Sequence, residues 1–323
     1  MSDNILVSIC IVNWNTKDLL YNCIQSIIQK TSNLSYEIIV VDNHSNDNSV
    51  EMIKNYFPAC ILIESDKNLG FVKANNLAIK HAKGKYILYL NPDTKLITNA
   101  IYAMSQYLEL NKSYGAVGCK LIFPNRKTQY VCARTFPTPF NQFCFLSMLD
   151  RLFPKSKILS SIEMRYWSHD DNREVDCISG ANMIIRKELI DRLGGFDSNI
   201  FMYAEDVDLC FRIKKIGWKI YYLSDEVIMH YTGSSSKKQK NKYFSTIMQR
   251  ESNLYFQKKH FGKLKEKQYL IAVFLGAMIR IFTMVILTPL LLFSKRARKK
   301  IPPQSFFKYL TLLKWSLTVK LNK

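Results

Sequence analysis

Apolar positions change their period several times along the first 123 residues. Short runs rich in β-branched residues predict strands at 5–12, 36–41, 60–63 and 86–90. Between them, apolar residues spaced three and four apart predict helices at 16–29, 46–56 and 74–81. This alternation of strands and helices indicates an α/β fold, in which helices cover both faces of a mainly parallel sheet.

Three of the predicted strands run into polar residues. Asn13 follows the first strand, Asp42 the second, and Asn91 and Asp93 the fourth. Open α/β sheets bind ligands beyond the carboxyl ends of their strands, so we expect these side chains to line one crevice. The chain contains neither G-x-G-x-x-G nor G-x-x-x-x-G-K-[ST], so neither a dinucleotide fingerprint nor a P-loop explains this crevice.

The pattern becomes less regular after residue 123. Residues 124–174 contain four prolines and the aromatic-rich stretch Phe140–Phe145. We interpret them as an irregular insertion at the start of a second half, 124–262, which would be the substrate side, after a nucleotide half at 1–123. Helical spacing returns between Glu205 and Ile216, and a strand at Trp218–Tyr222 followed by a short turn precedes His230.

The formal net charge of +20 is concentrated at one end of the chain. Residues 237–323 hold 20 basic and 2 acidic side chains, a net of +18, whereas the first 236 residues are nearly neutral. No zinc-finger, basic-zipper or RNP pattern accompanies this charge, so we expect no nucleic-acid partner.

The eight cysteines include no C-x-x-C pair, which argues against a zinc ribbon or disulfide scaffold and favours a reducing setting. The first apolar run lacks a preceding basic region, which argues against a secretory signal.

The basic C-terminal segment, 263–323, also carries the longest apolar run of the chain. Leu270–Phe293 has the length of a membrane span, but Arg280 near its middle is costly in hydrocarbon. Phe306–Leu321 mixes large apolar residues with lysines, as interfacial amphipathic helices do. We therefore predict a monotopic or re-entrant anchor on an anionic membrane surface, in preference to a full span or a buried core helix.

Several side chains are candidates for chemistry, and each has a structural alternative. Asp42 suits hydrogen bonding to a nucleoside, although Asp is also common at turns and helix N-caps. Asp93 suits a hard cation that takes further ligands from phosphates, and His230 could share that cation, although an Asn-Pro-Asp turn and a structural histidine are equally ordinary. Asp206, next to Glu205 in the first turn of a helix, could act as a general base or only complement the helix dipole.

Taken together and in order, these segments resemble family 2 glycosyltransferases. The matching segments are Ser8–Asn15 at the opening, Val41–Asp47 (D-N-x-S-x-D), Asn68–Asn76 (N-x-G-F-x-x-A-N-N), Gly194–Asp197 with Tyr203–Leu209 (G-G-F-D and E-D-x-D-L), and His230–Ser234 (H-x-x-G-S). Asn91-Pro92-Asp93 stands where the family carries a metal-binding D-x-D, so its first acidic position is an amide here. The subgroup with N-P-D is most similar to bacterial rhamnosyltransferases of polysaccharide assembly.

The resemblance implies a GT-A fold, a nucleotide-sugar donor, a divalent cation (Mg²⁺ or Mn²⁺) and inversion at the anomeric carbon. It implies that Asp206 is the catalytic base, with Glu205 orienting it, and that Asp93 and His230 hold the metal. It also implies a set of residues for the nucleotide sugar: Asn13, Asp42, Asn68, Gly70, Asn75, Asn91 and Asp93.

We expect the donor to be a sugar nucleotide such as dTDP-rhamnose. The acceptor would be a lipid-linked saccharide, reached from the cytoplasmic face of a bacterial plasma membrane. Two other classes stay open. A processive membrane polysaccharide synthase would usually carry several spans and a Q-x-x-R-W element, which the sequence lacks. A non-catalytic carbohydrate-binding protein at the membrane surface would have no need of Asp93, Asp206 and His230. The oligomeric state is not readable from the sequence.

Overall fold

The structure is a computed structural model that describes residues 5–232, 243–293 and 304–319, with the side chains of all except 288–293 and 304. The chain divides into two compact units. One, here called the sheet unit, comprises Met1–Phe136 and Ser168–Gln239; the other, the helical unit, comprises Pro137–Trp167 and Lys240–Lys323. These units differ from the expected division at 123 and 262. Residues 137–167 pack with the C-terminal helices, and residue 262 lies inside the helical unit.

The first half of the sheet unit follows the predicted rhythm closely. Four parallel strands alternate with three helices: β1 (Val7–Asn13), α1 (Lys17–Lys30), β2 (Tyr36–Asp42), α2 (Ser49–Tyr56), β3 (Ile61–Glu64), α3 (Gly70–Lys80) and β4 (Tyr86–Leu90). Helix α3 begins at Gly70, four residues before the predicted start, because the Asn68 side chain accepts the Gly70 N–H at 2.9 Å. Such a bond satisfies a backbone donor that the first turn leaves open.

The second half turns the sheet into a mixed one. It adds β5 (Thr94–Leu96), α4 (Ala100–Leu110), β6 (Tyr114–Ile122), β8 (Arg173–Glu174), β10 (Asn182–Arg186), α7 (Lys187–Leu193), α8 (Glu205–Lys215) and β11 (Lys219–His230). Among the described residues the nine strands run in the order β3-β2-β1-β4-β10-β6-β11-β5, with β8 beside β11. Strand β10 is antiparallel to both β4 and β6, so the expectation of a mainly parallel sheet holds only for the first half.

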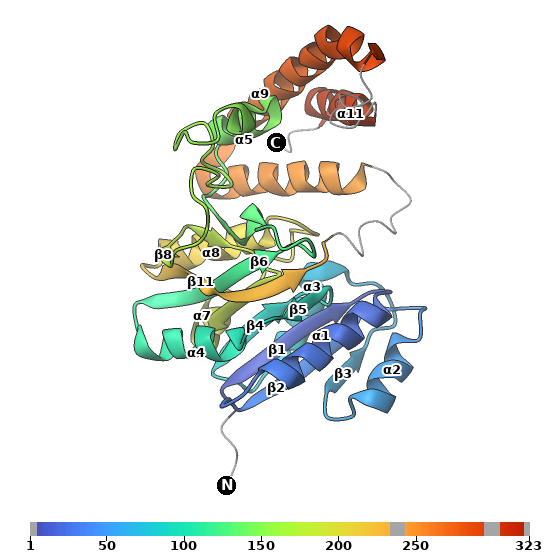
Figure 1. Cartoon of the computed structure of the whole chain (residues 1–323), viewed down its shortest axis with the longest axis vertical. Helices are drawn as coiled ribbons and strands as arrows, with labels where there is room; N and C mark the ends of the chain where they lie inside the picture. The colour runs from blue at the N-terminus through green and yellow to red at the C-terminus, as the bar shows by residue number, and fades with distance from the viewer. Residues whose placement is uncertain (1–4, 233–242, 294–303, 320–323) are drawn as a thin grey trace. The chain divides into compact units, whose positions relative to one another are not determined.

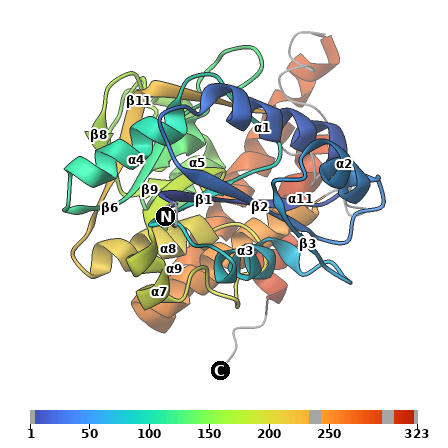
Figure 2. The same cartoon turned by 90° about the horizontal axis from the view of Figure 1, so that it is seen from below.

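Helices cover both faces of this sheet, as predicted. Figure 2 shows α1 and α4 on one face and α3, α7 and α8 on the other. All five residues of β10 are buried between these layers. A strand covered on both sides reads as a continuous apolar run instead of an alternating one, which suits its Met183-Ile184-Ile185 centre.

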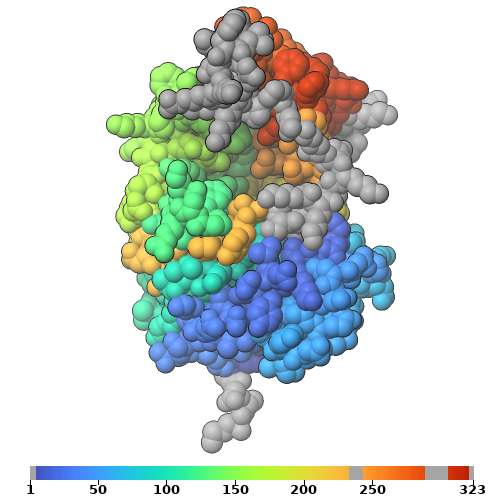
Figure 3. Space-filling view, turned by 45° about the vertical axis from the view of Figure 1, so that its right-hand side comes forward, coloured from blue at the N-terminus to red at the C-terminus, as the bar shows by residue number. Residues whose placement is uncertain are grey.

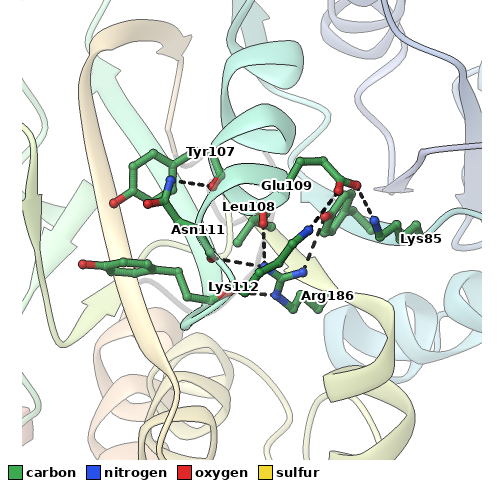
Figure 4. A network of polar contacts seen from close by, with 9 residues as sticks. Lys85, Tyr107, Leu108, Glu109, Asn111, Lys112 and Arg186 are labelled. Carbon is green, nitrogen blue, oxygen red and sulfur yellow. Dashed lines mark hydrogen bonds and ion pairs between the residues drawn. The ribbon is translucent and has the colours of Figure 1, made fainter.

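Arg186, the last residue of β10, ties the sheet to the end of α4. Its guanidinium donates to the carbonyls of Leu108 (2.5 Å), Asn111 (3.2 Å) and Tyr114 (2.9 Å), as Figure 4 shows for the first two. The Leu108 and Asn111 carbonyls stand at the end of α4, so the contact closes the C-terminus of this helix. Beside it, burial alone would raise the pKa of Glu109, but hydrogen bonds from Lys85, Tyr86 and Lys112 lower that pKa to about 2.

Strand β11 is longer than predicted. Its register against β6 shifts between Leu223 and Val227, and it then continues to His230, which pairs with Thr94 of β5. The polar residues Ser224, Asp225 and Glu226 occupy the irregularity, and they interrupt the apolar pattern in the sequence. His230 is therefore the last residue of a strand and does not follow a turn after Tyr222. Residues Gly233 and Ser234 of the His230–Ser234 motif lie outside the described residues.

The helical unit contains α5 (Pro139–Ser147), α6 (Leu149–Leu152), α9 (Phe244–Phe293) and α11 (Gln304–Thr318). Residues 124–174 are thus more ordered than predicted: they also hold the 3-10 helix η1 (Tyr130–Cys132) and β7 (Ala133–Arg134), which pairs with β9 (Cys177–Ile178). Thr138 and Asn141 form a capping box at the start of α5, with Pro139 in its first turn.

Helix α9 bends once and forms the core of its unit. Gly262 adopts φ 82° and ψ −179°, and Figure 1 shows α9 as two helical segments on either side of such a bend. The buried core of the unit comes from α5, both segments of α9 and α11: Leu146, Leu254, Tyr269, Val273, Ala277, Leu312 and Trp315. Gly276 allows α5 to approach, because a Cβ there would lie 2.6 Å from the Leu146 Cβ.

Candidate active site

The carboxyl ends of β1 and β2 bring Asn13 and Asp42 together. The two residues pair in register, and the Asn13 amide donates to Asp42 Oδ1 at 2.9 Å. The backbone N–H of Ser45 donates to Asp42 Oδ2, also at 2.9 Å. A carboxylate has about four acceptor positions, so Asp42 keeps capacity for a ligand N–H or hydroxyl. The two side chains therefore lie together at the carboxyl ends of these two strands.

A second polar group lies at the loop before α3. Asn68 Oδ1 accepts from the Asn43 amide at 3.0 Å and from the Gly70 N–H at 2.9 Å. Gly70 has φ +77°, and a Cβ there would lie 2.9 Å from a ring atom of Phe201, so no larger residue fits without displacement. Next to it is a cavity of about 290 Å³, lined by Lys67, Asn68, Leu69, Val72, Lys73, Ser198, Asn199, Ile200 and Phe201.

Asn75 does not join this group by any contact that the structure describes. Its side chain is buried and donates to the Phe71 carbonyl at 2.9 Å, within helix α3 itself. That contact is structural. A donor-binding role for Asn75 stays a prediction without support from its surroundings.

Asp93 and His230 meet as predicted, although 137 positions separate them in the sequence. Asp93 Oδ1 lies 3.2 Å from His230 Nε2, and the backbone N–H of Tyr231 donates to the Asp93 carbonyl at 2.9 Å. The other imidazole nitrogen, Nδ1, lies 3.0 Å from Gln129 Oε1. When Nδ1–H donates to that amide oxygen, the Nε2 lone pair faces Asp93. This arrangement is the one that orients metal-binding histidines.

The residues around this pair fit a divalent cation. Asn91 lies beside it, with its amide nitrogen 3.4 Å from His230 Nε2, and its Oδ1 is buried without a hydrogen-bond partner in the described residues. An acceptor oxygen left open beside a carboxylate and an imidazole suits a cation. The described residues contain no cluster of three or more His, Cys, Asp or Glu, so the remaining ligands of such a cation would come from phosphates and water.

Asp206, in the first turn of α8, is held by three donors. Arg134 Nη2 donates to its Oδ2 at 2.7 Å, the Gly180 N–H donates to the same oxygen at 3.1 Å, and the Val207 N–H donates to Oδ1 at 2.8 Å. A charge-assisted bond such as the one from Arg134 is stronger than a bond between neutral groups, so it helps to fix the carboxylate in position. Counting these donors, one of its acceptor positions stays open.

The neighbouring Glu205 has a different environment. Its side chain is buried and its Oε2 has no hydrogen-bond partner among the described residues. Burial, reinforced by the negative charge of Asp206, raises the pKa of Glu205 to about 8. Glu205 therefore holds its proton more tightly than an ordinary carboxylic acid does.

Two short segments connect these groups. The turn before β10 touches both sides, because the Ala181 carbonyl accepts the Asn91 N–H at 3.1 Å while Gly180 donates to Asp206. Residues 129–134 also serve both, since Gln129 orients His230 and Arg134 pairs with Asp206. The Asp93–His230 pair and the Asp206 carboxylate are therefore linked through these two segments within the sheet unit.

Sequence reasoning did not find Gln129, Arg134 and Gly180. Each is isolated in an irregular stretch and forms its contact with a residue 26 to 101 positions away. No residue spacing and no local sequence motif indicates these long-range contacts.

Comparison with known proteins gives a consistent class. A family model described as glycosyl transferase family 2 matches residues 8–194, which is more than half of the chain. A second, described as glycosyl transferase family 21, matches residues 147–291.

Curated relatives have similar descriptions. O-antigen biosynthesis protein RfbC of Myxococcus xanthus is 25% identical over 72% of this chain, which spans only 18% of that protein. Rhamnosyltransferase WbbL of Escherichia coli is 26% identical over 70% of this chain and 83% of its own length. An N-acetylglucosaminyl-diphospho-decaprenol L-rhamnosyltransferase of Mycobacterium tuberculosis is 24% identical over 62% of this chain and 67% of its own length.

A solved structure agrees in fold. The mannosyltransferase PcManGT from Pyrobaculum calidifontis, in complex with GDP-Man and Mn²⁺, matches with a TM-score of 0.60 at 17% sequence identity. The match covers 99% of this chain and 89% of that one. It supports the expected GT-A-type fold.

Proposed function

The chain belongs to glycosyl transferase family 2, and on that premise we propose that it moves a sugar from a nucleotide-diphosphate donor to a hydroxyl group of a lipid-linked saccharide. The observation that carries this proposal is the connected site of Asp93, His230 and Asp206 at one edge of the sheet. The names of two relatives, both rhamnosyltransferases, favour a rhamnose donor and a role in building a bacterial surface polysaccharide.

The strand ends would bind the donor. Asp42 would accept hydrogen bonds from the nucleoside, next to Asn13, and Asn68 with Gly70 would shape the neighbouring part of the pocket. Asp93 and His230 would hold a divalent cation, Mg²⁺ or Mn²⁺, with the open Asn91 Oδ1 beside them. Such a cation neutralises the charge that develops on a diphosphate leaving group. Asn91 replaces an acidic residue, so the protein itself contributes one negative charge fewer to this position.

Asp206 would act as the general base. The acceptor oxygen forms a bond to the anomeric carbon while the bond from that carbon to the diphosphate oxygen breaks, and its electron pair leaves with the diphosphate. The hydroxyl proton passes to the open acceptor position of Asp206. Arg134 and two backbone N–H groups fix this carboxylate in position before the reaction.

The raised pKa of Glu205 bears on whether the anomeric configuration is inverted or retained. A retaining double displacement needs a second ionised carboxylate as a nucleophile, whereas a single displacement needs only one base. Burial and the negative charge of Asp206 raise the pKa of Glu205 to about 8, which disfavours Glu205 as an ionised nucleophile. We therefore propose direct displacement with inversion.

The test is a transfer assay with the full chain, a panel of dTDP-, UDP- and GDP-sugars, and a polyprenyl-diphosphate saccharide as acceptor. We expect one sugar to be added per acceptor, with the anomeric configuration inverted in the NMR spectrum of the product. Retention would overturn the role of Asp206. Addition of many sugars per acceptor would favour a processive synthase, and failure to transfer or hydrolyse any donor would favour a binding protein.

A further inference from the structure

The helical unit holds more positive charge than it can balance by itself. By sequence it contains 22 basic and 4 acidic residues. Each of the four acids has a partner elsewhere in the unit. Asp150 and Glu163 pair with Arg165, Glu266 lies 3.9 Å from Lys258, and Glu251 accepts from the Trp315 indole at 3.3 Å.

Four of the basic residues form a group that we call the cationic cluster: Arg151 of α6, Arg250 of the first segment of α9, Arg280 of its second segment, and Lys308 of α11. Burial lowers the pKa of the Lys308 ammonium, and the positive charges of Arg250, Arg151 and Arg280 lower it further. Within the described part of the chain, no carboxylate forms an ion pair with any of them.

Two guanidinium groups of the cluster retain donors inside the fold. Arg250 is 4% exposed and donates to the amide oxygens of Gln142 and Gln249, both neutral groups. Arg280 lies against the Tyr309 ring, 5.5 Å from its centroid. The Nε atoms of both arginines are buried without an acceptor among the described residues. A buried charge without a partner is unfavourable, so an anion from outside the chain would relieve it.

The surface next to the cluster has the chemistry of a lipid contact. On the second segment of α9, Tyr269, Val273 and Ala277 face the core of the unit. An exposed apolar stripe occupies other positions of the same segment: Ile271, Leu275, Met278, Ile279, Phe282, Val285 and Ile286. Helix Phe244–Leu287 has the length and composition to cross a membrane, and only 28% of its most apolar window is buried. Figure 3 shows α11 and part of α9, in red and orange, at the molecular surface.

We propose that the cationic cluster binds the diphosphate of a membrane-embedded polyprenyl-diphosphate saccharide, while the apolar stripe of α9 contacts the hydrocarbon of the bilayer. Guanidinium groups recognise phosphate oxygens through their N–H donors, and the Nε donors of Arg250 and Arg280 have no acceptor among the described residues. The identity of the lipid rests on the proposed transfer reaction. The recognition of a lipid-borne phosphate rests on the helical unit itself.

The first experiment measures binding of the full chain to three kinds of vesicle. All consist of phosphatidylcholine and contain a polyprenyl diphosphate, the corresponding polyprenyl alcohol, or phosphatidylglycerol at the same total charge as the diphosphate. We expect the diphosphate vesicles to bind roughly tenfold or more tightly than either of the others, as charge-assisted hydrogen bonds would give. Equal affinity for phosphatidylglycerol would overturn the diphosphate as the ligand and leave a phospholipid headgroup in its place.

The second experiment compares two double variants of equal charge. Arg280→Gln with Lys308→Gln removes two cluster charges, whereas Lys263→Gln with Lys267→Gln removes two exposed charges of the same helix. We expect the cluster variant to lose the preference for diphosphate vesicles and the matched control to keep it. Lys308→Gln alone, at an exposed position, serves if the double variant unfolds. If both double variants lost this preference equally, the cluster would contribute only general attraction to anionic surfaces and would not be a specific diphosphate site.

A third measurement separates this inference from the transfer reaction. A water-soluble acceptor saccharide without a lipid diphosphate should be used equally well by the wild type and the cluster variant. Transfer that fails in both, while the vesicle preference persists, would reject the proposed function but not the cluster. A cluster variant that is equally impaired on soluble and lipid-linked acceptors would reject the cluster as a lipid-diphosphate site.

Discussion

The two units place their buried charged groups in different surroundings. In the sheet unit, Asp206 is matched by Arg134 and two N–H groups, and Asp42 by Asn13 and Ser45. In the helical unit, Arg250 and Arg280 keep buried Nε donors without an acceptor in the described residues. The first unit therefore holds Asp206 and Asp42 by hydrogen bonds from its own residues. For the second unit, we propose that an anion from outside the chain supplies the missing acceptor.

The two units also differ in how fully they bury their apolar residues. The sheet unit encloses its strands β4 and β10 completely. The second segment of α9 buries one face and exposes the other, including Leu275 and Phe282. A contiguous exposed apolar stripe on a soluble unit marks an interaction surface. The chemistry would thus lie in one unit and the membrane attachment in the other, and separate substitutions should be able to uncouple them.

The largest effect that we expect concerns the sheet unit. Asp206→Asn should lower transfer by roughly 10²–10⁴-fold, the usual contribution of general-base catalysis, while donor affinity and vesicle binding stay unchanged. Asp191→Asn is the matched control, because Asp191 is exposed and paired only with Lys187. Near-normal turnover of the Asp206 variant would assign the base to another residue.

The second prediction concerns the metal. Chelation with EDTA should abolish transfer, and Mg²⁺ or Mn²⁺ should restore it. Gln129→Ala, which removes the acceptor for His230 Nδ1, should weaken metal-dependent donor binding by roughly 10–100-fold, the range found for such outer partners. Titrations of donor binding at several metal concentrations would measure this. Full activity in the presence of chelator would show that transfer does not require a metal.

The third prediction concerns pH and stability. The unfolded chain releases the Glu205 proton near the ordinary value of 4.5, whereas the folded chain holds it to about 8. The folded state thus binds more protons in this window, so stability should fall as pH rises through it, by up to about 1 kcal/mol per pH unit. Glu205→Gln should flatten this slope in urea unfolding curves measured between pH 5 and 8. An unchanged slope would show that Glu205 is not the group responsible.

The smallest effect concerns the helical unit. Phe282→Ala should weaken binding to anionic vesicles by roughly three- to tenfold, because part of an apolar side chain no longer leaves water. Leu110→Ala, at an exposed leucine of the sheet unit, should change nothing. High salt should loosen the wild type only in part, since screening removes the charge contribution and leaves the apolar one. If the two variants bound vesicles equally in a flotation assay, the assignment of membrane attachment to the helical unit would be wrong.

The sequence alone determined the elements whose signal is local. The strands and helices of the first 90 residues follow from hydrophobic period, and their polar ends lie at one edge because parallel strands share a direction. The ordered motifs identified the family and pointed to Asp93, His230 and Asp206. The prediction that these residues and the donor-binding set act in catalysis stays open to the tests above.

The tertiary structure alone decided what joins residues far apart in the chain. Gln129 reaches His230 across 101 positions and Arg134 reaches Asp206 across 72, from a stretch predicted to be irregular. Arg250 and Arg280 belong to one cluster only because α9 bends at Gly262. Periodicity reports which face of an element is apolar, but not which distant element covers it. A contact between two isolated polar residues therefore leaves no pattern until the chain has folded.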